Sequence, residues 1–71
     1  MMDDTHIALT KRQHTILTMV WDGLRNRTIA HELGVTVKAV EFHKARICHK
    51  WNEKNWILLC RLGVKRGYLK V

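Results

Sequence analysis

Proline is absent from this sequence of 71 residues, and glycine occurs only four times. Sandwiches and barrels of β-strands need many tight turns, which these two residues favour. Apolar residues make up 46% of the chain, which is too many for a disordered segment and enough for one small core. The sequence therefore predicts a single all-α domain.

Cysteine is also scarce, because Cys48 and Cys60 are the only two. Two cysteines do not make the disulfide framework of a small secreted protein. The acidic start of the chain, with Asp3 and Asp4, is the opposite of a secretory signal, and no apolar run approaches the length of a membrane span, about 20 residues. We therefore expect a cytoplasmic protein that has no membrane partner.

The patterns that carry catalysis or metal binding are missing from the sequence as well. It contains no glycine-rich phosphate loop and no nucleophile elbow, and its six acidic residues are scattered. Its five histidines and two cysteines include no C-x-x-C or H-x-x-x-H pair. We expect no enzyme activity, no metal site and no cofactor, and we interpret both cysteines as small packing residues.

Positive charge is what the sequence has in excess. Its 13 Lys and Arg outnumber six Asp and Glu and give a formal net charge of +7, concentrated in the second half of the chain. A small body with this field attracts polyanions, of which nucleic acid is the first candidate. An acidic protein surface or an anionic membrane comes after it.

The first predicted helix begins after Thr10 and ends at Gly23. Thr10 and Gln13 have the spacing of a capping box, in which each side chain bonds the backbone N–H of the other residue. Apolar residues then recur on one face at helical spacing: Ile16, Leu17, Met19 and Val20.

A second, short helix is predicted over Arg27 to Leu33, with Asn26 as its cap. A third helix should follow over about Val37 to Trp51, capped by Thr36. Because only a short turn separates the two, they must cross sharply. This is the outline of a helix-turn-helix.

The third predicted helix has two different faces when its residues are placed at about 100° intervals. Val40, Ile47 and Trp51 form one apolar seam that suits the core. The opposite face, flanked by Glu41 and Arg46, holds side chains of mixed chemistry: Lys38, Phe42, Ala45 and His49. An ordinary solvated surface has no need of an aromatic ring, so this face is a candidate binding surface.

A fourth helix is predicted from about Trp56 to Arg66, capped by Asn55, with Leu59, Leu62 and Gly63 toward the core. A second apolar face carries Ile57, Cys60 and Val64. A domain of this size should bury only one of these faces, so we expect the second to contact a partner.

From Leu9 to about Leu69 the sequence resembles the LuxR-type (GerE-like) helix-turn-helix domain of bacterial transcription regulators. The resemblance is carried by short motifs along the whole chain: Leu9-Thr10 with Arg12, Ile16-Leu17, Gly23-Leu24, Asn26-Arg27-Thr28-Ile29-Ala30 with Leu33, Thr36-Val37-Lys38-Ala39-Val40-Glu41-Phe42-His43, Ile47, Lys50, Leu59, Leu62 and Gly67. The match is specific because some fifteen positions agree in type and spacing.

The resemblance implies an all-α, four-helix regulator that binds double-stranded DNA as a dimer, with the third helix in the major groove. We expect residues 1–8 to be an N-terminal tail and residues 9–71 to form the single helix-turn-helix domain. Many members of the family carry a control domain before this one, and the chain is interpreted as the standalone form.

The candidate DNA-binding residues divide by chemistry. For base readout, Glu41 can accept from a cytosine amine, Phe42 can meet a thymine methyl and Ala45 allows close approach. Side chains expected at phosphates or at a helix start are Lys38, Lys44, Arg46, His49, Asn26, Arg27, Thr28 and Thr36. The candidate dimer contacts on the fourth helix are Ile57, Cys60, Arg61 and Val64.

Two alternatives stay open on the sequence alone. The chain could be an interaction module that pairs with a larger regulator or an RNA polymerase subunit, through the doubly apolar fourth helix. It could also be related to the fourth region of sigma factors. That region usually ends after the recognition helix, whereas this chain continues to Gly67.

Overall fold

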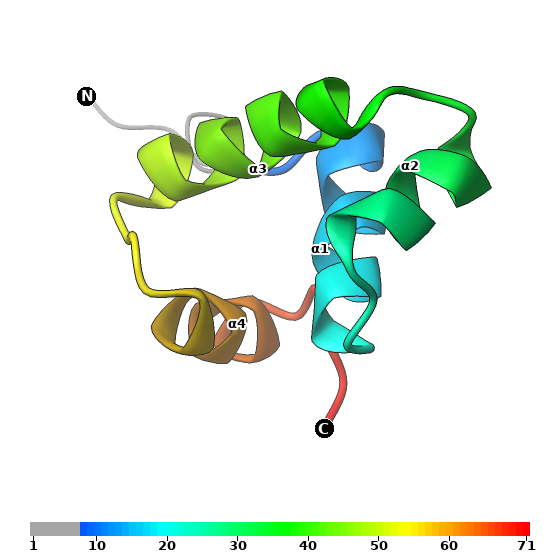
Figure 1. Ribbon diagram of the computed structural model, residues 1–71. Coiled ribbons are helices and arrows are strands. Elements are labelled where there is room, and N and C mark those ends of the chain that lie inside the picture. The colour runs from blue at the N-terminus through cyan, green and yellow to red at the C-terminus, as the bar shows by residue number, and fades with distance from the viewer. Residues whose placement is uncertain (1–7) are drawn as a thin grey trace.

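The computed structural model describes residues 8–71, and the N-terminal residues 1–7 lie outside it. Four helices follow one another along the chain: α1 (Lys11–Trp21), α2 (Asn26–Leu33), α3 (Val37–Trp51) and α4 (Trp56–Lys65). In Figure 1, α3 runs along one edge of the molecule, α4 lies at the opposite edge, and α1 stands between them. The all-α, four-helix prediction is confirmed.

Local side-chain caps start three of the four helices. Thr10 and Gln13 form the predicted capping box of α1, with N–H to oxygen distances of 3.1 and 3.0 Å. The Thr36 hydroxyl accepts from the Ala39 N–H at α3, and the Asn55 amide oxygen accepts from two N–H groups at the start of α4. These bonds satisfy donors that a helix start leaves free.

The start of α2 differs from its prediction. Asn26 is the first helical residue rather than the cap, and Arg25 precedes it with no side-chain cap bond. The Asn26 amide oxygen instead accepts from the Lys44 ammonium on α3, at 3.0 Å. A contact between two helices has replaced the local cap, which no local spacing pattern can reveal.

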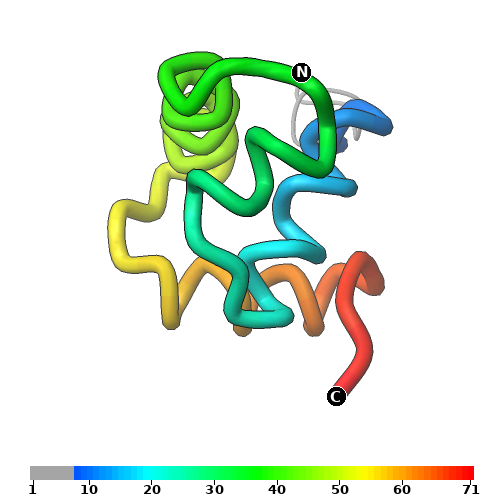
Figure 2. Tube along the Cα trace, turned by 45° about the vertical axis from the view of Figure 1, so that its right-hand side comes forward, coloured from blue at the N-terminus to red at the C-terminus, as the bar shows by residue number. Residues whose placement is uncertain are grey.

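A tight turn at Gly34 sets the crossing of α2 and α3. Gly34 has φ of 67°, a left-handed conformation that favours glycine, and the Val35 N–H closes back onto the Ala30 carbonyl. Helix α3 therefore begins directly beyond the turn. Figure 2, turned by 45° from Figure 1, shows α3 nearly end-on above α2.

The core lies where the four helices meet. Six side chains have no exposed surface: Ile16, Leu17, Ile29, Val40, Ile47 and Leu59. Trp51 is also buried, so the predicted seam of α3 (Val40, Ile47 and Trp51) is confirmed in full. At about 1.5–3 kcal/mol for each fully buried aliphatic side chain, this seam is what fixes α3 against the domain.

Both ends of the described chain are tied to the helices. The Tyr68 hydroxyl accepts from the Leu9 N–H at 3.0 Å, and Leu69 is buried beside Gly63. The Lys50 ammonium donates to the Ala8 carbonyl and to the buried Gln13 amide, at 2.8 and 2.9 Å. Local sequence patterns do not predict this closure, because it joins residues far apart in the chain.

The prediction of an unburied second face on α4 is wrong for two of its three residues. Cys60 is 7% exposed and belongs to the core, and the half-buried Val64 packs against it. Only Ile57, at 74% exposed, faces outward as predicted. The domain covers more of α4 than expected, since α1 packs against it and the segment after it folds back as far as Leu69.

Candidate nucleic-acid interface

The outer face of α3 is the most distinctive surface of the domain. All six residues that the sequence placed on it or at its flanks are exposed: Lys38, Glu41, Phe42, Ala45, Arg46 and His49. Phe42 is 58% exposed on the same helix whose opposite face is completely buried. The helix therefore presents an aromatic ring, cations and a carboxylate from a rigid support.

Phe42 has two ring neighbours on α3. The Arg46 guanidinium lies 5.7 Å from the centre of the Phe42 ring, one helical turn along. On another side, the His43 ring meets it edge-on, with 5.6 Å between centroids. Guanidinium–ring contacts of this kind orient the cation over the ring face.

The Lys44 side chain lies between α3 and its neighbours α2 and α4, rather than on the outer face of α3. It is half-buried, and its ammonium lies 3.0 Å from the Asn26 amide oxygen and 4.9 Å from the centre of the Trp56 ring. One side chain of α3 thus joins α2 and α4. The sequence grouped Lys44 and Asn26 with the phosphate contacts, but both side chains are engaged within the domain.

The starts of α2 and α3 together form a basic hollow. An open cavity of about 570 Å³ is lined by Arg25, Arg27, Thr28, His31 and Val37. The first N–H groups of α2 and the two arginines make the hollow suited to an anionic oxygen. Arg27 and Thr28 were predicted from the sequence, but Arg25 and His31 were not. Nothing in the local sequence distinguishes these two from other basic residues near the ends of a short helix.

Thr36 is exposed at the start of α3, but its hydroxyl oxygen already accepts from the Ala39 N–H at 3.0 Å. Its structural role is therefore the cap. This bond does not use the hydroxyl proton, which can still be donated to an acceptor.

Residues 7–62 match a family of proteins described as bacterial regulatory proteins of the luxR family, whose model is named GerE. This match spans most of the chain. The chain belongs to the LuxR family of bacterial regulatory proteins. The resemblance proposed from the sequence is confirmed.

Curated relatives of this LuxR-family chain carry regulator names. It is 40% identical over 63 residues to the probable transcriptional regulator ycf29 of Pyropia yezoensis, covering 89% of this chain and 28% of that protein. It is 32% identical over 61 residues to the transcriptional regulatory protein FixJ of Rhizobium meliloti, covering 86% and 30%. With the oxygen regulatory protein NreC of Staphylococcus carnosus it shares 37% over 67 residues, covering 94% and 31%.

The LuxR-family chain therefore spans less than a third of the length of these relatives. No solved structure gives a significant match to the chain.

Between α1 and α4, the LuxR-family domain has an apolar groove. The groove has a volume of about 510 Å³ and is lined by Val20, Trp21, Trp56, Ile57, Cys60 and Arg61. Trp21 is 41% exposed, and its ring N–H donates to the Lys70 carbonyl at 3.1 Å. Three predicted partner contacts, Ile57, Cys60 and Arg61, thus line this groove together with two tryptophans.

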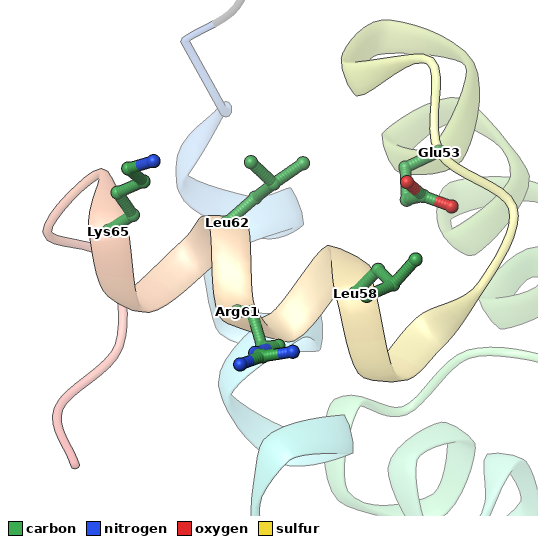
Figure 3. A pocket seen from close by; sticks show the side chains of 5 residues that line it. All are labelled: Glu53, Leu58, Arg61, Leu62 and Lys65. Atoms are coloured by element: carbon green, nitrogen blue, oxygen red, sulfur yellow. The ribbon is translucent and has the colours of Figure 1, made fainter.

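A second hollow follows another side of α4. It measures about 450 Å³ and is lined by Glu53, Leu58, Arg61, Leu62 and Lys65. Figure 3 shows Leu62 and Arg61 pointing to different sides of the helix. Leu62, which the sequence assigned to the core, is only half-buried at this edge.

The two thiols pack as the sequence predicted. Both cysteines are free, and burial raises the pKa of the Cys60 thiol above its ordinary value. Burial likewise raises the pKa of Cys48 and outweighs the lowering effect of nearby Lys44. Within residues 8–71, no three His, Cys, Asp or Glu side chains lie close enough to hold a metal ion. No described helix could span a membrane.

We predict that Lys44→Ala destabilises the domain, whereas Arg46→Ala does not. The first change removes the donor to Asn26 and the cation beside Trp56, at a cost of about 1–2 kcal/mol in the free energy of unfolding. The second removes an exposed side chain and should cost less than about 0.5 kcal/mol. Urea unfolding followed by circular dichroism measures both. Equal losses would show that Lys44 is an ordinary surface cation.

Proposed function

We propose that the chain is a sequence-specific transcription regulator, rather than an enzyme, and that it binds double-stranded DNA with α3 in the major groove. The observation that carries this proposal is the division of α3 into a fully buried face and an exposed face bearing Phe42 among charged residues. Membership of the LuxR family and the regulator names of its relatives support it.

Within this proposal, the outer face of α3 supplies base contacts. Glu41 accepts a hydrogen bond from a cytosine amine, Phe42 packs on a thymine methyl, and Ala45 lets the helix approach closely. All three are exposed, and no part of the domain needs to move to free them.

Phosphate contacts come from the edges of the same surface. Arg25, Arg27 and Thr28 line the hollow at the start of α2, and Lys38 is exposed in the first turn of α3. Thr36 and His49 are exposed toward the two ends of α3. Such contacts fix the orientation of the protein on the duplex and carry no sequence information of their own.

Selection from random duplexes tests the proposal, because it predicts enrichment of one motif. Arg27→Ala should lower the affinity for the duplex with this motif and for an unrelated duplex by the same factor. It should also make the slope of log affinity against log salt shallower by about one. Lys65→Ala, which removes an exposed cation on α4, is the matched control and should leave the slope unchanged. Absence of any enriched motif would contradict the proposed function.

The regulator is proposed to act as a homodimer that pairs through the groove between α1 and α4. The groove is apolar and open, and none of its lining residues belongs to α3, so an isologous pairing buries it while leaving both recognition surfaces free. The contacts would centre on Ile57, Arg61 and Trp21, with only the small exposed part of Cys60. Two α3 helices then address half-sites about one turn of DNA apart.

Ile57→Asp should dissociate this dimer without unfolding the chain, because the side chain is 74% exposed. Sedimentation velocity should show a monomer where the wild type is a dimer, and binding to the two-half-site duplex should weaken. The substitution Val64→Asp is a poor test, because Val64 packs against the core. Unchanged sedimentation together with unchanged binding would exclude this groove as the dimer contact.

A second candidate function is favoured by the hollow on the other side of α4. Leu58 is 43% exposed there beside Arg61 and Lys65, a combination suited to an apolar and acidic protein surface. In this alternative the chain pairs with a larger regulator or an RNA polymerase subunit. Binding to DNA that is sequence-blind and lost in moderate salt would favour it over the leading proposal.

A further inference from the structure

The geometry points to Arg46 as a reader of guanine, oriented by the Phe42 ring, at a step where guanine adjoins a base with a 5-methyl group. This inference rests on the proposed function and deepens it by stating part of the recognised sequence. From the sequence alone Arg46 is expected at a phosphate, but three structural observations favour a base contact.

First, Arg46 lies beside Phe42 at the flank of the outer face. It follows Phe42 by four positions, which places the two side chains about 40° apart around the helix axis. Both are exposed, and the guanidinium lies 5.7 Å from the ring centre. Because the two side chains share this part of the face, Arg46 can reach the edge of a base next to the one that Phe42 contacts.

Second, the ring restricts the guanidinium. An exposed arginine is usually free to adopt many rotamers, and ordering them on binding costs affinity. Phe42 is itself held against the His43 ring, at 5.6 Å between centroids, so the support under Arg46 is well defined. A planar guanidinium held in one orientation is suited to donate two hydrogen bonds to the O6 and N7 atoms of one guanine.

Third, the exposed part of the ring needs an apolar contact in the groove. Phe42 remains 58% exposed with Arg46 and His43 beside it. In the major groove the apolar atom within reach is the 5-methyl group of thymine, or of 5-methylcytosine. Because Phe42 and Arg46 are adjacent on the helix, this base adjoins the guanine that Arg46 reads.

Arg46→Lys tests the guanine contact, because it keeps the positive charge and removes the two-pronged donor. Selection from random duplexes with the wild type should give a motif that contains guanine beside thymine. With Arg46→Lys the preference for that guanine should fall at least about fivefold, while the other positions keep theirs. Arg12→Lys, at an exposed position on α1, is the matched control and should leave every position of the motif unchanged.

The methyl contact is tested by altering the DNA. Replacing the adjoining thymine by uracil removes only the methyl group, and should weaken wild-type binding several-fold in fluorescence anisotropy. A second pair of duplexes carries 5-methylcytosine or cytosine at this position, with guanine in the other strand. The wild type should bind the 5-methylcytosine duplex more tightly than the cytosine duplex, because only the first keeps the methyl group. In Phe42→Ala the uracil and thymine duplexes should bind equally, and the guanine preference should also fall because Arg46 loses its support.

The outcomes separate this inference from the function on which it rests. A selected motif that Arg46→Lys leaves unchanged, with a uniform loss over all duplexes, would overturn the inference and keep the proposed function, because Arg46 would then contact phosphate. An equal response of the wild type to uracil and thymine would overturn the methyl contact. Failure to select any motif would contradict the proposed function and the inference together.

Discussion

The burial of one face of α3 is the constraint on which the rest of the structure depends. Val40, Ile47 and Trp51 have little or no exposed surface, so rotation of α3 about its axis would expose apolar area and cost several kcal/mol. The direction of the opposite face is thereby fixed by the buried face. A small domain can in this way present Phe42 and its neighbours to a ligand, while the buried side chains of the same helix stabilise the fold.

Lys44 and Arg46 are two cations two positions apart on α3, and they have different roles. The difference follows from the same buried face. Lys44 faces the junction of the helices and joins Asn26 to Trp56, whereas Arg46 faces outward over the Phe42 ring. Charge alone does not distinguish them. Orientation about the helix axis does, and that orientation is set by the buried seam.

Local sequence patterns predicted much of the fold because they depend on contacts within one helical turn. The capping box of Thr10 and Gln13, the cap at Asn55 and the alternation of faces on α3 are of this kind. Asn26 was wrongly predicted as the cap of α2, because its amide oxygen accepts from Lys44 on α3 instead. Cys60 was wrongly predicted on an unburied face, because α4 packs against α1. Of the candidate site, the exposed face of α3 was predictable, but the hollow with Arg25 and His31 required the tertiary arrangement.

The direction in which α3 faces its ligand is tested most directly by an amide chemical-shift titration of the full chain with its selected duplex. If the outer face of α3 enters the groove, the largest shifts fall on residues 37–46 and on the first turn of α2. The tightly packed interior of α1 should change little. Shifts concentrated on residues 56–65, with α3 unperturbed, would contradict the assignment of α3 as the helix that binds DNA.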